Sequence, residues 1–469
     1  MVYHPPPPPD PQATLPKFID TPSAPPLGLP TAVETVLSKA APPASPAEKP
    51  TEPLPQEHRL TTIPQALTAY GHNIKPLATE IISTTEALHR CLAEAACSHI
   101  DLPSFTQSAM DGYAVRSADV EWASSDKPQR LRVIGEIAAG PAQISLPSQG
   151  GGTAYRIYTG ARIPEHFDAV VPQEKVRVEG EYISLDRHVE KGRNVRVRAE
   201  EMHAGDTLSP PGQRVSPGML AALMAAGAHN IKVFKRPRIR VLVTGDEVVP
   251  PGQIPTEGQV HDANGPLVAA WLTSMGYPVP EITYVRDLLR DLEDALDPAL
   301  AVADVVLTTG GVSVGSRDYL PDAARTVGVR QVFWKVAQKP GRPLFFGMRE
   351  KTVLLGLPGN PASVLVGLVF HARRVLDLLE GTTAPGPRLT SAKLMQAVKA
   401  DPTRDLLLRM NLSLNPDGMI QLDPLPKQES HMLSNLATAM AMVLLPARER
   451  DYAAGERVLW TPLPGVTRI

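Results

Sequence analysis

Between residues 237 and 382 the chain alternates apolar runs with segments of helical periodicity. Runs such as RIRVLVTG, DVVLTTGG and TVLLGLPG are typical of buried strands, whereas NGPLVAAWLTSMG and RDLLRDLEDALD repeat apolar residues every three or four positions. The region closes with a long apolar helix, NPASVLVGLVFHARRVLDLLEG. Strands that alternate with helices of this length predict a doubly wound α/β domain with a mostly parallel sheet covered on both faces.

Short segments with β-strand character dominate the regions that flank this domain. Residues 101–189 carry short apolar runs separated by Gly, Pro and Asp, which predict a β-rich small domain. Residues 383–469, with runs such as DLLLRMNLSL, alternate in period two and predict a C-terminal domain resembling a β-barrel. We therefore expect a multidomain protein of the α/β plus β class.

Two further stretches, 61–100 and 190–236, are expected to form a linking domain of helical and extended segments. Apolar spacing predicts helices across residues 62–100, where Ser83 and Glu86 resemble a capping box. Another helix is expected near residues 216–227, because Ser216 can cap its start and Gly227 suits its end.

The first 60 residues differ in composition from the rest of the chain. They contain 17 of the 50 prolines and few aromatic or β-branched residues. Such a segment cannot bury enough apolar surface to offset its ordering entropy, so we expect it to be disordered. The run Pro5 to Pro9 suits either a plain spacer or a partner that recognises polyproline.

Bulk composition excludes several classes of function. The 469 residues are 43% hydrophobic and 20% charged, with a net charge of −2, which gives no general attraction for nucleic acid or an anionic membrane. Cys91 and Cys97 are too few for a four-cysteine metal site or a disulfide framework. Without a run of about 18 apolar residues or a secretory signal pattern, we expect a cytoplasmic protein with no membrane segment.

The stretch DVVLTTGGVSVGSRDY leaves an apolar run through closely spaced glycines. Ligands of open α/β sheets bind beyond the carboxyl ends of the strands, where Gly310, Gly311 and Gly315 would let the backbone approach an anion closely. Ser313 adds a hydroxyl and Asp318 a carboxylate. The alternative is a tight strand-to-helix turn in which Asp318 is only a helix cap. The spacing is neither a P-loop nor a dinucleotide fingerprint.

Carboxylates follow three successive predicted strands of this domain. Asp246 and Glu247 come after the first strand, Asp287 after the second and Asp318 after the third. Hard carboxylate oxygens suit Mg²⁺, which commonly binds through a few carboxylates and ligand phosphates. The sequence therefore predicts a magnesium site at Glu247, Asp287 and Asp318.

Basic residues lie in the stretch WKVAQKPGRPL. Lys335 and Lys339 are four residues apart and would share a face of one strand, and Arg342 follows a Pro-Gly turn. Together they suit a phosphate or a tetrahedral oxyanion, although a solvated basic edge remains the alternative. The motif LPGNPAS then opens the last helix. Its candidate substrate-binding residues are Pro358, Gly359, Asn360, Pro361 and Ser363.

The motifs FTQSAMDGYAV, YTGARIPEHFDAVVPQE, GRNVRVRAEEMHAGD, TGDEV, TTGGVSVGSRDY, KVAQKPGRP and LPGNPAS occur in order over residues 62–465. In order and spacing the chain resembles the molybdopterin molybdenumtransferase family, which includes the C-terminal domain of gephyrin. The resemblance implies an enzyme that combines adenylylated molybdopterin with molybdate, in a Mg²⁺-dependent reaction, to give molybdenum cofactor and AMP. It also implies a homodimer with the active site between subunits.

Functional positions follow from the resemblance motif by motif. They are Asp111, Thr159, Glu201, Glu247, Asp287, Asp318, Lys335 and Lys339. The resemblance further implies that Arg342 and Ser363 contact molybdate, and it leaves Arg404, Arg409 and Ser430 as candidates that could equally be ordinary residues of the β domain.

Several positions depart from the family's usual pattern. Ala199, Glu200 and Glu201 stand where Gly-Glu-Asp is common, and Arg342 stands in place of Lys in KPGKP. Ser316 replaces a frequent acidic residue, and Met440 follows Ala439 where Asn is frequent. None removes an expected charge from the matched core, but together they leave room for a diverged paralogue.

Two other functions remain open at this point. A molybdopterin adenylyltransferase would need only a domain like residues 238–381, and a non-catalytic scaffold could use the same fold. Small molecules are the expected ligands, and a molybdopterin adenylyltransferase and apo-molybdoenzymes are candidate protein partners.

Overall fold

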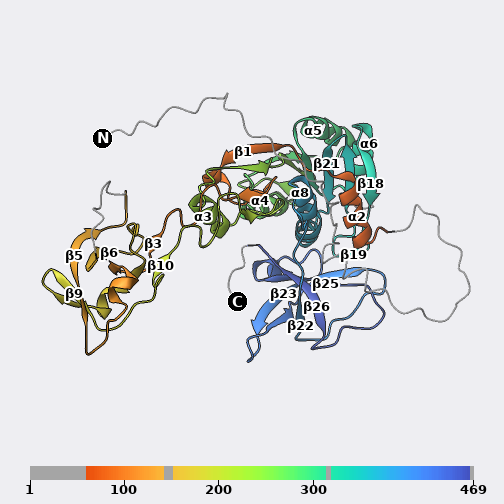
Figure 1. The fold of residues 1–469 in the computed structure, drawn as a ribbon. Coiled ribbons are helices and arrows are strands. Elements are labelled where there is room, and N and C mark those ends of the chain that lie inside the picture. The colour runs from red at the N-terminus through yellow and green to blue at the C-terminus, as the bar shows by residue number, and fades with distance from the viewer. Residues whose placement is uncertain (1–59, 142–150, 313–317, 465–469) are drawn as a thin grey trace, which may run out of the picture. The chain divides into compact units, whose positions relative to one another are not determined.

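The structure is a computed structural model, and it describes residues 60–141, 151–312 and 318–464 (Figure 1). The prediction of disorder for the first 60 residues falls almost wholly outside these ranges. Among the described residues, no helix combines the length and apolar content needed to cross a membrane.

The first described element is helix α2, Ile63–Asn73. Thr62 and Gln65 form a reciprocal capping box at its start. The helices predicted beyond it are wrong. The chain instead forms strand β1 (Thr79–Ser83) and a 3₁₀ turn (Thr84–Glu86), and Ser83 makes no capping hydrogen bond. The reason is tertiary: β1 pairs with β12 (Asn230–Phe234), far along the chain, and this pairing overrides the local apolar spacing.

Helix α3, Pro217–Ala225, confirms the helix expected in the second linking stretch. The Ser216 side chain accepts a hydrogen bond from the Met219 backbone, and Gly227 has a φ of +75° just beyond the helix. Two short pairings involve the second linking stretch, one with the first linking stretch and one with residues of the 101–189 region. They are β2 (Ala96–Cys97) with β11 (Thr207–Ser209), and β3 (Gln107–Ser108) with β10 (Val195–Arg196).

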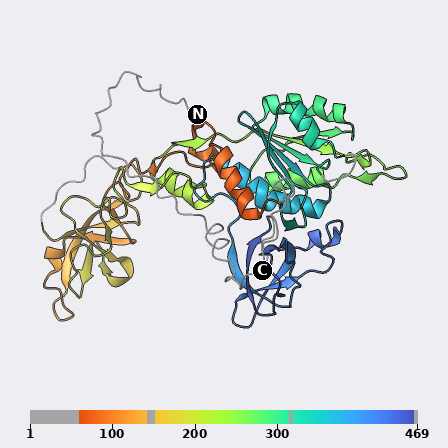
Figure 2. The same ribbon diagram turned by 90° about the vertical axis from the view of Figure 1, so that its right-hand side faces the viewer.

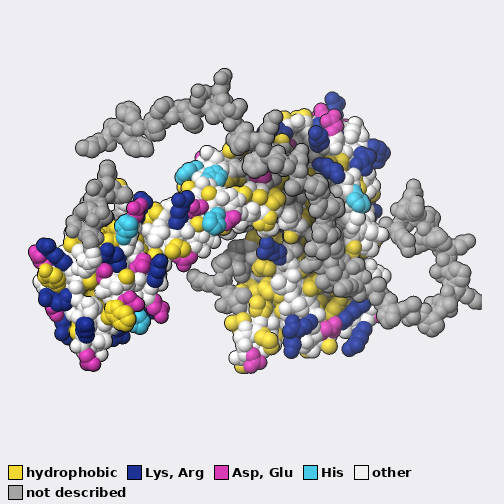
Figure 3. Space-filling model, in the orientation of Figure 1, with side chains coloured by type: hydrophobic (Ala, Val, Ile, Leu, Met, Phe, Trp, Pro, Cys, Tyr) yellow, Lys and Arg dark blue, Asp and Glu magenta, His cyan; other side chains and the backbone are white. Residues whose placement is uncertain are grey.

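The small β domain contains a six-stranded sheet in the order β7-β4-β6-β5-β9-β8. Its strands are β4 (Gly112–Val115), β5 (Gln129–Ile137), β6 (Thr153–Ile157), β7 (Ala169–Pro172), β8 (Arg177–Glu179) and β9 (Tyr182–Leu185). Gly112 is required sterically, because a Cβ atom there would lie 2.0 Å from the Val171 carbonyl oxygen. Charged side chains of both signs intersperse over this domain in Figure 3, and some, such as Arg130 and Glu179, form exposed ion pairs.

The α/β domain has a six-stranded sheet in the order β16-β13-β17-β21-β20-β18. Its strands are β13 (Ile239–Thr244), β16 (Glu281–Val285), β17 (Val305–Thr309), β18 (Arg330–Trp334), β20 (Phe345–Arg349) and β21 (Thr352–Leu357). Strands β16, β13, β17 and β21 are parallel, and only β20 is reversed, since it pairs antiparallel with both β21 and β18. The predicted, mostly parallel sheet is therefore confirmed.

Helices cover both faces of this sheet (Figure 2). They are α4 (Asn264–Ser274), α5 (Leu289–Val302), α6 (Leu320–Thr326), α7 (Pro361–Val366) and α8 (Arg373–Leu379). Helices α5 and α6 pack on the sheet through a buried cluster that includes Leu296, Leu320 and Leu354. The long closing helix occurs as predicted, but a π-helical turn, Gly367–Ala372, joins α7 to α8.

The C-terminal region contains a closed barrel of five strands, which confirms the predicted β-barrel-like domain. The strands β23-β24-β22-β26-β25 close because β25 pairs back with β23. Their bounds are β22 (Thr390–Leu394), β23 (Asp405–Leu414), β24 (Ile420–Pro424), β25 (Ala441–Leu445) and β26 (Arg457–Pro462). The short strand β19 (Gln338–Lys339) adds to β23 in parallel.

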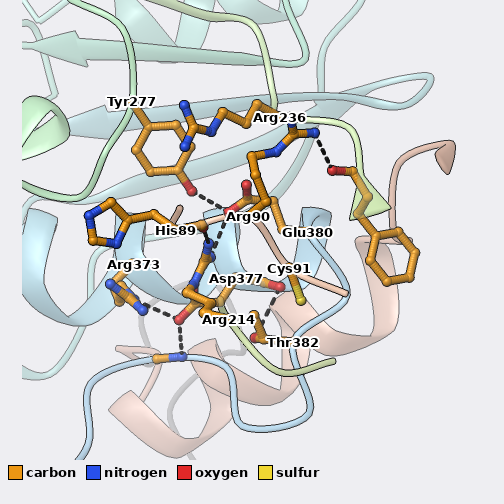
Figure 4. A network of polar contacts seen from close by, with 12 residues as sticks. His89, Arg90, Cys91, Arg214, Arg236, Tyr277, Arg373, Asp377, Glu380 and Thr382 are labelled. Atoms are coloured by element: carbon orange, nitrogen blue, oxygen red, sulfur yellow. Dashed lines mark hydrogen bonds and ion pairs between the residues drawn. The ribbon is translucent and has the colours of Figure 1, made fainter. Parts of the chain in front are cut away.

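A buried network of charged side chains joins α8 to the linking stretches (Figure 4). Arg214 donates hydrogen bonds to Asp377 at 2.6 Å and to Glu380 at 2.5 Å, and Tyr277 donates to Glu380 at 2.5 Å. The side chains of Asp377 and Glu380 are only 1% and 0% exposed. Burial alone would lower the pKa of Arg214, but the charge of Glu380 and that of Asp377 outweigh it and raise the pKa. Arg214 therefore bridges two carboxylates that have little access to water, and Arg373 supplies a second positive charge to Asp377.

Candidate active site

A cavity of about 760 Å³ lies beyond the carboxyl ends of the parallel strands. Loops after β13, β16, β17 and β21 contribute to its wall, together with residues 338–343 and the barrel residues Arg404 and Ser430. Ligands of doubly wound sheets bind at this edge. The position of the cavity therefore makes it the candidate active site.

Acidic side chains gather on one side of this cavity. Glu247, Asp287 and Asp318 line it, and the Asp287 backbone N–H donates to Asp246 Oδ1 at 3.1 Å. Burial raises the pKa of Asp287, and the negative charges of Asp246, Glu247 and Asp318 raise it further. The convergence follows from topology, because β16, β13 and β17 are adjacent parallel strands whose carboxyl ends meet at one edge.

The predicted magnesium site can be tested against this arrangement. Within the described ranges, no three or more His, Cys, Asp or Glu side chains are placed to hold a metal by themselves. Crowding of negative charge around Asp287 nevertheless favours a nearby cation. Because Mg²⁺ is usually held by one or two carboxylates with waters and substrate phosphates, the acids fit an ion shared with a phosphate-bearing ligand.

The glycine turn after β17 brings the backbone to the cavity wall. Gly310 and Gly311 line the cavity with φ values of +91° and +66°. A Cβ atom on Gly310 would lie 2.6 Å from Thr244 Oγ1 and 2.8 Å from the Thr244 carbonyl oxygen, so only glycine fits there. The other two candidates of this loop, Ser313 and Gly315, lie outside the described residues.

Basic side chains are contributed by the end of β19 and the turn that follows it. Lys339 and Arg342 line the cavity, but Lys335 is not among the residues that line it. The prediction that both lysines share a strand face is wrong, because β18 ends at Trp334 and Lys335 has a φ of +72°. The Lys335 ammonium lies 4.0 Å from the centroid of the Trp334 ring.

The LPGNPAS motif forms another part of the wall. Pro358, Gly359, Asn360, Pro361 and Ser363 all line the cavity. The Asn360 side chain donates to Ser430 Oγ at 2.9 Å, which ties this motif to the barrel. Of the barrel candidates, Arg404 and Ser430 also line the cavity. Arg409 does not line it; its side chain is fully buried and donates to Asn435 Oδ1 at 2.6 Å and to the Lys427 carbonyl at 3.1 Å.

Three candidates from the N-terminal half, Asp111, Thr159 and Glu201, do not line the cavity of their own chain. Asp111 accepts hydrogen bonds from the Thr159 backbone at 2.8 Å and from its hydroxyl at 2.7 Å. These two bonds, the backbone one first, lower the pKa of the exposed Asp111 carboxyl. Glu201 is also exposed, and its backbone N–H donates to the Leu102 carbonyl.

Sequence reasoning missed several residues of the cavity wall. Asp262 and Asn264 line it at the start of α4, and the Asn264 side chain donates to the Gly359 carbonyl at 2.7 Å. The run HDANG, which places Asp and Asn just before an apolar helix, was the available signal. Gln428 and Glu429 come from a barrel loop, and no local pattern indicates them.

The fold and the cavity define a multidomain protein built around a doubly wound α/β domain that binds its ligand at the carboxyl ends of the strands. Three family profiles match the chain: the MoeA N-terminal region (domain I and II) at residues 61–227, a probable molybdopterin binding domain at 240–377 and the MoeA C-terminal region (domain IV) at 391–463. Together they account for most of the described residues.

Known relatives agree with these matches. The molybdopterin molybdenumtransferase of Haemophilus influenzae is 34% identical over 82% of this chain and 94% of its own length. The enzyme of the same name from Staphylococcus epidermidis is 32% identical over 80% of this chain and 89% of its own. A crystal structure of the molybdopterin biosynthesis MoeA protein from Pyrococcus horikosii is 28% identical, with a TM-score of 0.70 over 87% of this chain and all of the other. The chain belongs to the molybdopterin molybdenumtransferase (MoeA) family.

Proposed function

We propose that this protein inserts molybdenum into molybdopterin, using adenylylated molybdopterin and molybdate as substrates and releasing AMP. The family matches over all three regions support this assignment. The observation that carries it is the cavity itself, in which acids at the ends of neighbouring strands share one space with Lys339 and Arg342. An adenylyltransferase built from the α/β domain alone is not favoured, because the N-terminal and C-terminal regions also match.

The two groups of charges suit the two parts of the proposed reaction. Lys339, Arg342 and Ser363 would bind the oxyanion, since guanidinium and ammonium groups donate strong hydrogen bonds to such oxygens. Glu247, Asp287 and Asp318 would hold Mg²⁺, which when bound neutralises charge on the phosphoanhydride oxygens. Gly310 and Gly311 would let backbone N–H groups approach the substrate closely.

A homodimer would complete this site. Asp111 and Thr159 form an exposed hydrogen-bonded pair on the small β domain and do not line the cavity of their own chain. We infer that they, together with Glu201, reach the cavity of a second subunit. Asp111→Ala and Asp287→Ala would each be inactive alone, whereas a mixture that exchanges subunits would regain activity. No recovery in proven mixed dimers would contradict the shared site.

The cytoplasm is the compartment that we propose, because both Cys91 and Cys97 are free thiols, as expected in a reducing environment. A molybdopterin adenylyltransferase that supplies the substrate and apo-molybdoenzymes that receive the product are the proposed protein partners.

The direct test is AMP release by the purified full chain given adenylylated molybdopterin, molybdate and Mg²⁺. We expect Asp287→Ala and Lys339→Ala to abolish release nearly completely while the protein stays folded. Asp294→Ala and Lys351→Ala, which change exposed residues outside the cavity, serve as matched controls with native activity. Full activity of the two cavity variants would overturn the site assignment, and no AMP release by the native chain would overturn the proposed function.

A further inference from the structure

A chain of buried side chains holds the turn formed by residues 339–342. It consists of Tyr70 in α2, His371 in the π-helical turn and Gln338 in β19, each of which is 0% exposed. The Tyr70 hydroxyl lies 3.0 Å from His371 Nδ1, and His371 Nε2 lies 2.9 Å from Gln338 Oε1. Gln338 Nε2 in turn donates to the Gly341 carbonyl at 2.9 Å. The chain thus runs from α2 to the turn that carries Lys339 and Arg342.

With His371 neutral, the donors and acceptors along these hydrogen bonds allow one arrangement. The Gly341 carbonyl can only accept, so Gln338 donates through its amide nitrogen and its oxygen must accept from His371. His371 therefore carries its proton on Nε2, and its Nδ1 accepts from the Tyr70 hydroxyl. Burial lowers the pKa of His371 to about 3 and raises the pKa of Tyr70 well above its ordinary value, so both groups are neutral at neutral pH.

Packing fixes both ends of the chain. The Tyr70 ring makes edge contacts with Phe346 and Phe333, at centroid distances of 4.7 Å and 5.6 Å. At the other end, Gly341 has a φ of +90°, and a Cβ atom there would lie 3.0 Å from Gln338 Nε2. The π-helical turn is also informative, because such turns often occur at functional sites.

We propose that Tyr70, His371 and Gln338 are positioning residues that hold the 339–342 turn so that Lys339 and Arg342 face the anionic substrate. The inference rests on the proposed function of the cavity. Gln338 lines the cavity, whereas His371 and Tyr70 lie behind it and act through Gln338. Loss of these hydrogen bonds should weaken the binding of molybdate more than it slows the chemical step.

The decisive comparison is His371→Leu against His371→Gln. Leucine removes both ring nitrogens, and we expect the KM for molybdate to rise about tenfold, equivalent to roughly 1.4 kcal/mol, with kcat within about twofold of native. Glutamine can place an amide N–H near the position of Nε2, so it should restore the KM. Leu296→Ala, which loosens the separate buried cluster under α5 and touches none of these residues, should lower the melting temperature and leave the KM unchanged.

A measurement without turnover completes the test. ¹⁵N NMR of the native chain should show His371 as the neutral Nε2–H tautomer between pH 6 and 8, a range in which an ordinary histidine titrates. A protonated ring or the Nδ1–H tautomer would overturn the proposal. So would an unchanged molybdate KM in folded His371→Leu, or no rescue by folded His371→Gln. If the native chain released no AMP, the proposed function would fail, and the NMR result would still decide whether the hydrogen-bonded chain exists.

Discussion

Replacing Arg214 by methionine should destabilise the protein more than the same change at Arg373, the other arginine that pairs with Asp377. Among the described residues, the change leaves Glu380 hydrogen-bonded to the Tyr277 hydroxyl, and it leaves Asp377 with Arg373 and the Gly386 backbone. Removing one partner from a buried ion pair costs about 3–5 kcal/mol, because the remaining charge is not compensated. With two buried acids affected, we expect a loss of unfolding free energy within this range.

Arg373→Met is the matched control for this prediction. Arg373 is 30% exposed and contacts Asp377, which would retain Arg214, so the expected loss is about 1 kcal/mol. Urea unfolding, followed by circular dichroism and by hydrogen exchange in α8, would measure both variants. Adding Glu380→Gln to Arg214→Met should recover part of the loss, because it removes an unpaired charge. A loss below about 1 kcal/mol for Arg214→Met, or a double variant less stable than the single one, would refute this account.

Substitutions at Ala199, Gly112 and Asp287 should also change the stability of the protein or of one of its strands. Ala199 has a φ of +62°, so Ala199→Gly should relieve left-handed strain and raise the unfolding free energy by roughly 0.5 kcal/mol, and a lower unfolding midpoint would contradict this. Gly112→Ala should disrupt the pairing of β4 with β7, since its Cβ atom would lie 2.0 Å from the Val171 oxygen, and hydrogen exchange in both strands would detect the loss. The pKa of Asp287 is raised, so its ionisation disfavours the folded state as pH rises through the folded pKa. Asp287→Asn should therefore raise the melting temperature at pH 7 and have little effect below the ordinary pKa of aspartate, and equal effects at both would contradict the argument.

The convergence of the acids was predictable because it depends only on strand order. Glu247, Asp287 and Asp318 each follow a strand, and parallel strands that are neighbours must end at one edge. The argument for Lys335 and Lys339 failed because it assumed a continuous strand. A positive φ at Lys335 ends that strand, and no residue pattern around Lys335 announces it.

Other features depend on contacts between distant parts of the chain. Residues 83–97 have the apolar spacing of a helix, yet Cys91 and Leu92 form β-bridges with residues of the second linking stretch. His371 and Tyr70 are 301 residues apart, and Gln428 reaches the cavity from a barrel loop. Local periodicity carries no information about such pairings, so the wall of the cavity could be predicted only where it coincides with strand ends.

The cavity contains a group of negative side chains and a group of positive side chains, and each group is unfavourable without a ligand of opposite charge. Burial, and after it the negative charges of Asp246, Glu247 and Asp318, raise the pKa of Asp287, while Lys339 and Arg342 line the same space. A phosphate-bearing ligand that shares a divalent cation would compensate both groups, because the cation pairs with the carboxylates and the phosphate pairs with Lys339 and Arg342. Either component alone would relieve only one side. We therefore infer that nucleotide and cation bind cooperatively, each raising the affinity for the other by the same factor, as thermodynamic linkage requires.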